Sequence, residues 1–466
     1  MKENSKEIIY KAGAVLIALA LWQLAAMTVG MDILLVSPVK VIARLFTIWR
    51  EEGFIGTVLF SLLRIMSGFL IALALGFLLA LAAGRIKAVE YLLWPYVVTF
   101  KAVPVASFII MCLIWLSYSQ LTVFISFLIV FPVIYSNVLT GLKNTDKDLL
   151  EMADVFRLSY GKKFKYIYMP GIRPYLESSC VISVGMAFKA GVAAEVIGVV
   201  DGSIGEKLYE AKIYFQSADL FAWTIILVVM SVLLEKLFSK LIRMIFAAGA
   251  KSHGFWKPSL NGKDEGDDSR NKKTDMGHDI VITDLNKSFG DKEVLNNLSR
   301  IFPAGQVSYI SGPSGSGKTT LFRIISGLTE PDSGSISGIP ENGKIGYVFQ
   351  EDRLCNDFSV FDNVALVRSG KIDRSKVMGH LHALGLGLEY DRKVSDLSGG
   401  MKRRVAIARA IYYDAPVILL DEPFNGLDDK LKNSVIEYVR KETAGKTVLL
   451  ITHDNKEKEM ILAEME

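Results

Sequence analysis

The chain has 466 residues, of which 51% are hydrophobic, and a formal net charge of +4. So small a charge gives no argument for a nucleic-acid partner. The three cysteines lack metal-site spacing and two of them lie in long apolar segments, so no disulfide framework is implied. The apolar residues are concentrated before about residue 250, whereas the remainder has the composition of a charged α/β domain. We therefore expect two domains, at 1–250 and 279–466, with 251–278 as a flexible, polar linker.

Six apolar segments of the first domain are long enough to span a bilayer, which takes about 20 residues. They lie at 8–29, 57–84, 92–116, 121–142, 174–200 and 220–246, and Pro95, Lys101 and Pro104 interrupt the third. Basic residues follow the second, fourth and sixth segments, so the positive-inside rule places both ends of the domain in the cytoplasm. The pattern predicts an all-α, multi-pass domain with six transmembrane helices in the cell membrane.

Four ionisable residues lie within these apolar segments, where charge is costly and often functional: Arg64, Lys101, Lys189 and Glu195. Arg64 and Lys101 are expected to reach an interface with their long side chains. Lys189 and Glu195 are six residues apart, so they lie on different faces of a helix. Our hypothesis is that Lys189, and with it Glu195, marks a translocation path for an anionic or polar solute.

The loop between the fourth and fifth segments, LLEMADVFRLSYGKKFKYIYMP, resembles the EAA loop of binding-protein-dependent importer permeases. It matches that pattern at Glu151, Ala153, Ile167 and Pro170, and departs from it at Met152, Arg157 and Met169. SPVKVI, SLLRIMSGFLIALALG and AAEVIG are similar to the sulfonate, nitrate and taurine type of permease. The resemblance implies a short coupling helix, with a sharp exit at Pro170, that docks on the second domain; the alternative is a merely basic cytoplasmic loop.

A glycine-rich loop, GPSGSGKTT, follows a short apolar run at 307–311 and precedes a segment with helical periodicity. This strand, loop and helix context is the one that a phosphate-binding P-loop requires. Backbone N–H groups of such a loop wrap the phosphates of ATP, while Lys318 reaches the β- and γ-phosphates and Thr319 ligates Mg²⁺. We assign nucleotide binding to Gly312, Pro313, Ser314, Gly315, Ser316, Gly317, Lys318, Thr319 and Thr320.

Two adjacent carboxylates end the apolar run PVILLDEP, about 100 residues after the P-loop. A buried strand that ends in acids is common by itself, but together with a P-loop it predicts the hydrolytic half of an ATPase site. Asp421 is expected to hold Mg²⁺ and Glu422 to act as the base that polarises the attacking water.

Between these elements, LSGGMKRRVAIARA resembles the signature sequence of ABC ATPases, with Met401 in place of the usual Gln. The resemblance implies that Ser398, Gly399 and Gly400 bind the γ-phosphate held by the opposite subunit. It also implies a Q-loop at Gln350 that senses Mg²⁺, a D-loop ending in Asp428, a switch His453 and a Phe289 that stacks on adenine.

One P-loop and one signature sequence cannot close an ATP site within one chain, so the family resemblance implies a homodimer. The sequence analysis therefore predicts an ATP-driven half-transporter that imports a small polar or anionic solute from a separate extracytoplasmic binding protein. The fusion of permease and ATPase also suits an exporter, and an ATPase whose membrane domain only anchors or signals is a third possibility.

Overall fold

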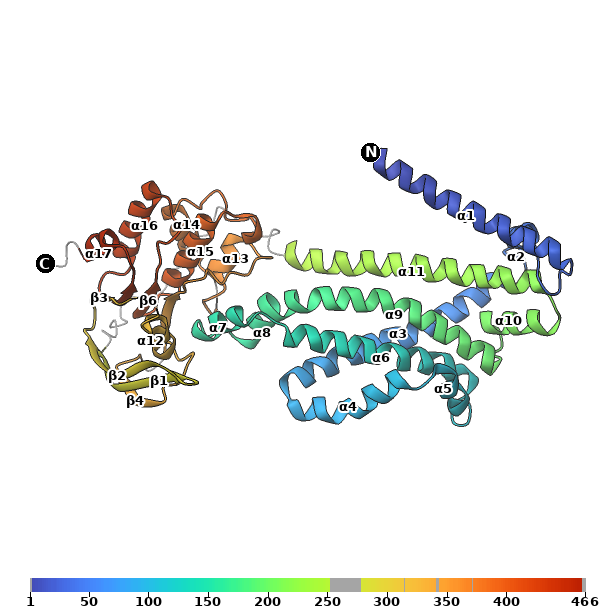
Figure 1. Cartoon of the computed structure of the whole chain (residues 1–466), viewed down its shortest axis with the longest axis horizontal. Helices are drawn as coiled ribbons and strands as arrows, with labels where there is room; N and C mark the ends of the chain where they lie inside the picture. Colours follow the sequence, from blue (N-terminus) through green and yellow to red (C-terminus); the bar gives the residue numbers. More distant parts are fainter. Residues whose placement is uncertain (1, 252–277, 314, 341–342, 371, 463–466) are drawn as a thin grey trace, which may run out of the picture. The chain divides into compact units, whose positions relative to one another are not determined.

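The structure is a computed structural model that describes residues 2–251, 278–313, 315–340, 343–370 and 372–462 (Figure 1). The chain divides into two compact units, Met1–Asn144 with Ile172–Ala247, and Thr145–Gly171 with Ala248–Glu466. Segment 145–171, which contains the EAA-like loop, thus packs with the second unit. Most of the expected linker, 252–277, lies outside the described residues.

The first unit is built from helices. They are α1 (Lys2–Val29), α2 (Pro38–Ile48), α3 (Phe54–Arg85), α4 (Lys87–Ala102), α5 (Val105–Cys112), α6 (Tyr118–Lys143), α9 (Met169–Gly198), α10 (Ile204–Ile213) and α11 (Ser217–Lys251). Within the described residues, five helices are long and apolar enough to cross a membrane, or six if the bent pair α4 and α5 counts as one span. The third expected segment is this pair.

The bend between α4 and α5 is 105° and has a local cause. Pro104 disfavours the helical conformation of the residue before it, and Val103 is accordingly extended, with φ −78° and ψ 132°. The interruption expected within 92–116 is therefore a break between two helices at Pro104.

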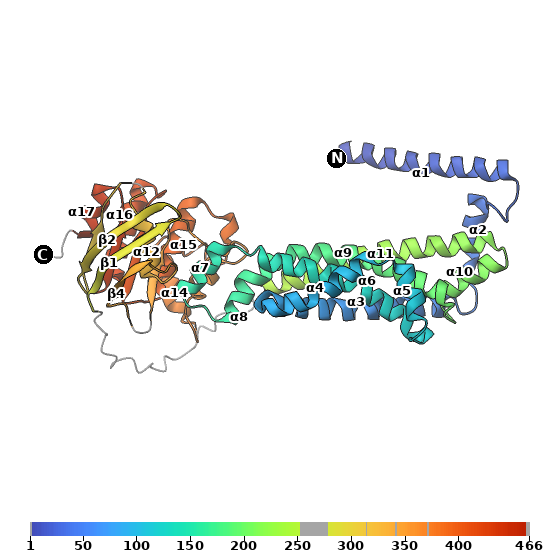
Figure 2. The ribbon, with the colours of Figure 1, turned by 60° about the horizontal axis from the view of Figure 1, so that its bottom comes forward.

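Glycines let α3 approach two other helices closely, and α3, α6, α9 and α11 run side by side (Figures 1 and 2). A Cβ on Gly68 of α3 would lie 2.3 Å from the carbonyl oxygen of Val123 in α6. A Cβ on Gly191 of α9 would lie 2.6 Å from Cγ1 of Ile65 in α3. Small residues at such crossings are typical of helices that pack within a membrane.

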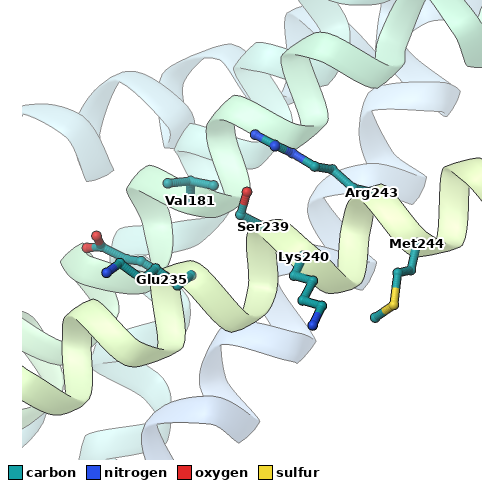
Figure 3. A pocket seen from close by; sticks show the side chains of 7 residues that line it. Val181, Glu235, Ser239, Lys240, Arg243 and Met244 are labelled. Atoms are coloured by element: carbon teal, nitrogen blue, oxygen red, sulfur yellow. The ribbon is translucent and has the colours of Figure 1, made fainter. Parts of the chain in front are cut away.

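A groove of about 570 Å³ separates α9 from α11 near one end of α11 (Figure 3). Its lining residues are Val181, Glu235, Lys236, Ser239, Lys240, Arg243 and Met244. Arg243 reaches toward α9, where its Nε donates to Oε1 of Glu177 at 2.6 Å, whereas Lys240 points to the other side of α11. This basic end of α11 is the one that the positive-inside rule assigns to the cytoplasm.

The second unit holds two sheets. Strands β1 (Ile280–Phe289), β2 (Lys292–Phe302) and β4 (Ser333–Ser337) form an antiparallel sheet in the order β2-β1-β4. Strands β3 (Val307–Ile310), β5 (Ile345–Val348), β6 (Val417–Asp421) and β7 (Thr447–Ile451) form a parallel sheet in the order β3-β7-β6-β5. β5, β6 and β7 are buried along their whole length, as in parallel sheets that are covered on both faces.

Helices complete this unit: α7 (Lys147–Val155), α8 (Tyr160–Lys163), α12 (Lys318–Ile325), α13 (Val360–Ala365), α14 (Arg374–Ala383), α15 (Gly399–Tyr412), α16 (Asp429–Glu442) and α17 (Asn455–Leu462). Short helical turns lie at Phe164–Tyr168, which is π-helical, and at Val394–Asp396. The architecture is thus the expected one, a helical membrane-type region followed by an α/β P-loop domain.

The sharp exit expected at Pro170 is wrong. Residues 160–198 form one helical stretch, and Pro170 is the second residue of α9. The π-helical turn before it is wider than an α-helical turn, and the backbone N–H of Met169 donates to the carbonyl of Phe164, five residues back. A proline lacks an N–H and clashes with the carbonyl four residues before it, so this wider turn lets the helix pass through Pro170.

Candidate nucleotide site and coupling contact

The parallel sheet brings the sequence-predicted elements of the nucleotide site to one edge. The P-loop follows β3, Gln350 follows β5, Asp421 ends β6, and His453 follows β7. Because the carboxyl ends of parallel strands meet at the same edge of a sheet, segments from four separate parts of the sequence lie together there. This edge is where α/β folds of this kind bind their ligands.

The glycines of the P-loop are required by its geometry. Gly315 and Gly317 have φ of 81° and 84°, in the left-handed region that favours glycine. A Cβ on Gly317 would also lie 2.7 Å from Cδ2 of Leu295. Lys318 begins α12 and its Nζ donates to the carbonyls of Gly312 and Pro313, at 2.7 and 2.9 Å. The Lys318 ammonium therefore lies over the loop that is expected to hold the phosphates. Ser314, the remaining member of this set, lies outside the described residues.

Asp421 has the features of a magnesium ligand. Its side chain is only 2% exposed, and its Oδ2 has no hydrogen-bond partner among the described residues. Burial raises the pKa of Asp421 to about 6, while a hydrogen bond with Thr319 opposes that shift. The described residues contain no cluster of three or more His, Cys, Asp or Glu side chains able to hold a metal. The predicted ligands Thr319, Gln350 and Asp421 all carry oxygen donors, which are the ligands that a hard cation such as Mg²⁺ prefers, so the residues fit the predicted magnesium site.

Glu422 lies beside His453 in an unusual backbone conformation. Its φ is 47°, which is uncommon for any residue other than glycine. Oε1 lies 3.4 Å from Nε2 of His453, and Oε2 accepts a hydrogen bond from Nδ2 of Asn425 at 3.3 Å. The backbone N–H of Glu422 donates to the carbonyl of Ile451, so strand β7 holds the turn in place. The Glu422 carboxylate and the His453 ring therefore lie next to each other at this edge of the sheet.

The signature sequence opens helix α15. Ser398 is the N-cap, and Ser398 and Gly399 are exposed, so their backbone N–H groups are open to an anion. A Cβ on Gly400 would lie 3.3 Å from the carbonyl oxygen of Gly426. Met401, at the usual Gln position, packs against the hydrophobic core and so contributes to packing instead of polar contacts.

Two further predicted nucleotide contacts are solvent-exposed. Phe289 ends β1 and is 53% exposed, and Nζ of Lys287 lies 5.4 Å from the centre of its ring. An exposed aromatic face of this kind is available for stacking on a base. Asp428 is exposed at the N-cap of α16. The roles of both residues stay predictions.

The EAA-like segment contacts the nucleotide-binding unit through Glu151. Its carboxylate accepts two hydrogen bonds from Arg323, at 2.6 and 2.7 Å, and one from Nη1 of Arg353 at 2.7 Å. Arg323 lies on α12, which begins at the P-loop Lys318, and Arg353 lies three residues after Gln350. The hydrogen bonds from Arg323 and the weaker effect of the one from Arg353 lower the pKa of Glu151 to about 2. One carboxylate thus joins α7 to both the P-loop helix and the Q-loop.

Apolar contacts surround this ion pair. Met152 and Ala153 of α7 are buried in the same hydrophobic core as the parallel sheet. The rings of Phe156 and Tyr413 meet edge to face with centroids 5.1 Å apart, and those of Tyr166 and Phe358 lie 4.6 Å apart. Nζ of Lys162 donates to the carbonyl of Leu366 at 2.6 Å. The EAA-like segment is therefore a packed part of this unit, as the coupling-helix interpretation expects.

Arg157, which replaces the glycine of the EAA pattern, adopts the conformation that explains that glycine. Its φ is 52°, in the left-handed region. Its side chain extends toward Gly343, where a Cβ would lie 1.8 Å from Nη2 of Arg157. Arg157 therefore stands where the EAA pattern has a glycine, keeps the left-handed conformation, and adds a side-chain contact near Gly343.

Substitutions of Arg157 compare the effect of left-handed backbone strain on stability with the effect of losing the side-chain contact. Arg157→Gly is expected to differ little in stability from the wild type, because relief of about 1–2 kcal/mol of left-handed strain offsets the lost contact and the extra chain entropy of glycine. Arg157→Ala keeps the strain and loses the contact, so it should be about 1 kcal/mol less stable than Arg157→Gly. Thermal unfolding of the purified variants measures both; equal stabilities for the Gly and Ala variants would contradict the strain.

Of the two path candidates, Glu195 is fully buried and Lys189 is exposed. Oε2 of Glu195 accepts hydrogen bonds from Oγ of Ser61 at 2.8 Å and from the backbone N–H of Gly205 at 3.4 Å. Glu195 therefore connects α9 with α3 and with the first turn of α10. This bonding supports a structural role for Glu195, while a path role for Lys189 stays a prediction.

Arg323 and Arg353 are functional candidates that the sequence did not predict. They lie 172 and 202 residues from Glu151 in the chain. No local pattern marks such partners, since the pairing depends on how α7 docks.

Two protein families match this chain. Residues 295–425 match the family described as "ABC transporter", and residues 72–247 match the family described as "Binding-protein-dependent transport system inner membrane component". The two matches cover the two parts of the chain that the sequence analysis separated.

Curated relatives resemble the second part. A sulfate/thiosulfate import ATP-binding protein CysA from Mycobacterium bovis is 36% identical over 39% of this chain and 56% of its own length. The protein of the same name from Escherichia coli (strain K12) is 39% identical over 38% of this chain and 54% of its own length. The chain thus spans about half the length of these relatives. Among solved structures, the dimeric bacterial ABC transporter cassette MJ0796 is 29% identical and covers 39% of this chain and 90% of that one, with a TM-score of 0.36.

Proposed function

Because this chain joins a binding-protein-dependent permease domain to an ABC transporter ATPase domain, we propose that it is one half of a homodimeric, ATP-driven importer. The proposal places the permease in the cell membrane with its ATPase in the cytoplasm, and assigns solute delivery to a separate extracytoplasmic binding protein. The observation that carries it is the Glu151 carboxylate, held by Arg323 of the P-loop helix and by Arg353 beside the Q-loop. That contact ties a permease loop to the nucleotide site.

The ATP site is proposed to assemble from two copies. The P-loop of one copy binds the phosphates through its backbone N–H groups and Lys318, and Phe289 stacks on the base. The exposed N-terminus of α15 in the other copy, at Ser398 to Gly400, caps the γ-phosphate, and Asp428 lies at the facing surface. Each chain carries one of each element, so two sites form in a dimer.

Hydrolysis is proposed to depend on Glu422. Its carboxylate takes a proton from the attacking water, and His453 contacts the γ-phosphate from the adjacent strand end. Mg²⁺, when bound, supplies charge neutralisation for the β- and γ-phosphates. Thr319, Gln350 and Asp421 are the residues that would hold it, and the unpartnered Oδ2 of Asp421 supports this assignment.

Coupling is proposed to run through α7. When nucleotide draws two ATPase units together, α12 and the Q-loop move with the phosphates they bind. Since Glu151 is bonded to both, α7 follows, and the helical stretch that continues from 160 to 198 carries that displacement into the membrane. The permease helices would then alternate between open faces.

Import is favoured over export by two observations. The permease match is to a binding-protein-dependent family, and relatives of the ATPase part are named as import ATP-binding proteins. The names of those relatives, sulfate and thiosulfate, agree with the expected class of small polar or anionic solutes. The observation that favours export is the fusion of permease and ATPase in one chain, which is the usual layout of exporters.

A reconstitution experiment separates these possibilities. The purified chain in nanodiscs is expected to be a dimer whose ATPase activity rises when the loaded binding protein encoded beside its gene is added. In vesicles, the solute should move from the side on which the binding protein is added to the side that carries the ATPase. Stimulation of ATPase activity by free solute alone, with solute moving in the opposite direction across the vesicle membrane, would support the exporter. A particle that stays monomeric throughout turnover would refute the proposed assembly.

A further inference from the structure

One buried arginine of the signature helix bonds to both hydrolytic segments of the ATPase unit. Arg403, on α15, is 4% exposed. Its guanidinium donates to five backbone carbonyls: Phe349 at 2.6 Å, Gln350 at 3.2 Å, Asp421 at 2.9 Å, Glu422 at 2.5 Å and Pro423 at 2.9 Å. It also bonds to Oδ1 of Asp352 at 3.3 Å. An arginine is rarely so buried unless its donors are satisfied in this way.

These acceptors belong to two segments only. One is the Q-loop that follows β5 and carries Gln350, and the other is the turn after β6 that carries Asp421 and Glu422. Because a guanidinium is a rigid, planar fork with donors on several sides, it holds the two segments at a set separation and fixes both relative to α15. A shorter amide side chain has two N–H donors and cannot bond to both segments in this way.

The bond to Glu422 has a specific consequence. Glu422 has a left-handed φ of 47°, a conformation that persists in a non-glycine residue only when its surroundings hold it. Nη2 of Arg403 bonds to the carbonyl of this residue, and the Ile451 carbonyl accepts its N–H. Both peptide groups flanking the Glu422 Cα are therefore held, and they set the direction in which its carboxylate points.

We propose that Arg403 is a positioning residue for ATP hydrolysis, which acts through Glu422 and Gln350 without touching nucleotide. This inference rests on the proposed ATPase function and deepens it. Since Arg403 lies on the helix that the signature sequence opens, it makes the orientation of the base in one subunit depend on the position of α15. That helix, in turn, caps the nucleotide of the opposite subunit, so the two sites of the dimer are linked through Arg403.

The neighbouring arginine is a matched control. Arg404 is also buried, on the same helix, and its guanidinium also donates to backbone carbonyls, those of Leu384 at 2.6 Å and Gly400 at 3.3 Å. Neither acceptor belongs to the segment of Gln350 or to that of Glu422. Gly400 is a signature residue, but the long bond from Arg404 is to its carbonyl, within α15, and not to the N–H that would face a phosphate. Arg404→Gln therefore removes a buried guanidinium of the same kind without releasing either hydrolytic segment.

The test measures ATPase kinetics of the full chain in nanodiscs. Arg403→Gln is expected to lower kcat roughly 10–100-fold, because a misplaced base costs about that much, while the Kd for ATP changes less than about threefold. Arg404→Gln should lower kcat by less than about threefold. Equal losses in the two variants, or an unchanged kcat in Arg403→Gln, would overturn the inference.

A double-mutant cycle shows whether Arg403 acts through the base. In a Glu422→Gln background, adding Arg403→Gln should lower the remaining single-turnover rate by less than about threefold, because the base that it positions is already absent. Losses that multiply would mean a general structural role and would overturn the inference. If Arg403→Gln does not fold, Arg403→Lys, which keeps the charge but has fewer donors, is measured in its place with the same criteria. A wild-type chain that binds ATP but never hydrolyses it would refute the proposed function itself.

Discussion

Replacing Glu422 with Gln is expected to reduce ATP turnover by roughly 10²–10⁴-fold while ATP binding is retained, since this is the usual contribution of a general base. The amide has almost the same size as the carboxylate, so the turn after β6 and its hydrogen bond from Asn425 are preserved. What is lost is the ability to accept a proton from water. Phosphate release and nucleotide binding by the purified chain, measured with the same preparation, separate the two effects.

Glu351→Gln is the control for this experiment. Glu351 is an exposed carboxylate next to Gln350 on the same edge of the sheet, and the same chemical change there should alter kcat by less than about threefold. If Glu422→Gln turned over at the wild-type rate, another group would be the base. A loss of ATP binding in that variant would instead mean that Glu422 has a structural role.

The nucleotide site shows which kinds of feature a sequence reveals. The P-loop, Gln350, Asp421 and His453 each lie at the end of a strand of the parallel sheet, so a local pattern of apolar run and loop was enough to locate them. Gln350, Asp421 and His453 come from three different strands, and the parallel topology alone brings them to one edge. Phosphate binding by a P-loop requires glycines at a fixed spacing, so the sequence of the loop was sufficient to predict it.

Features that depend on how distant segments pack were not visible. Arg323 and Arg353 became partners of Glu151 only when α7 docked, and the bonds of Arg403 depend on the relative placement of two loops and a helix. The same limit applies to the segment 145–171. Its sequence continues the permease, yet its buried side chains belong to the core of the other unit.

Two prolines of the membrane half act in different ways, and only one of them was predicted wrongly. Pro170 was expected to end a helix, whereas a π-helical turn before it lets the helix continue. The interruption expected within 92–116 is present at Pro104, where the preceding residue is extended and a 105° bend separates α4 from α5. Whether a proline ends, bends or is tolerated by a helix depends on the carbonyls around it, and these are set by the backbone and not by the residue alone.

Reversing the charge of Glu151 is expected to uncouple transport from ATP hydrolysis. In Glu151→Lys, an ammonium would face the two guanidinium groups that now bond to the carboxylate, and the Arg353 side chain is only 8% exposed. Truncating one partner of a buried, hydrogen-bonded charge pair costs about 2–5 kcal/mol, and the lower end of that range applies to Glu151, whose side chain is 27% exposed. Because reversal adds repulsion, α7 should lose its contact with Arg323 and Arg353 in most molecules. Transport, and stimulation of ATPase by the binding protein, should fall more than about tenfold, while basal hydrolysis changes little.

Asp154→Lys is the matched control because it places the same charge change on the same helix. Asp154 is exposed and pairs with Lys163, not with the nucleotide-binding unit. Normal coupling in Asp154→Lys together with lost coupling in Glu151→Lys would locate the effect in the contact with Arg323 and Arg353. Equal transport in the two variants would contradict the coupling role of Glu151.

Coupling measured across the practical pH range in the wild type and in Glu151→Gln distinguishes an ion pair from a neutral hydrogen bond at this contact. The pKa of Glu151 is lowered from 4.5 to about 2, so the carboxylate stabilises docking fully above pH 4.5 and loses that contribution as pH falls toward 2. Between pH 5 and 8, about the range in which transport assays are practical, the ratio of stimulated to basal ATPase should therefore be constant in the wild type. Glu151→Gln, which keeps a hydrogen-bond acceptor but no charge, should show a reduced ratio over that whole range. If this variant coupled as well as the wild type, shape and hydrogen bonding would be sufficient, and the charge of Glu151 would not be what binds α7 to the P-loop helix.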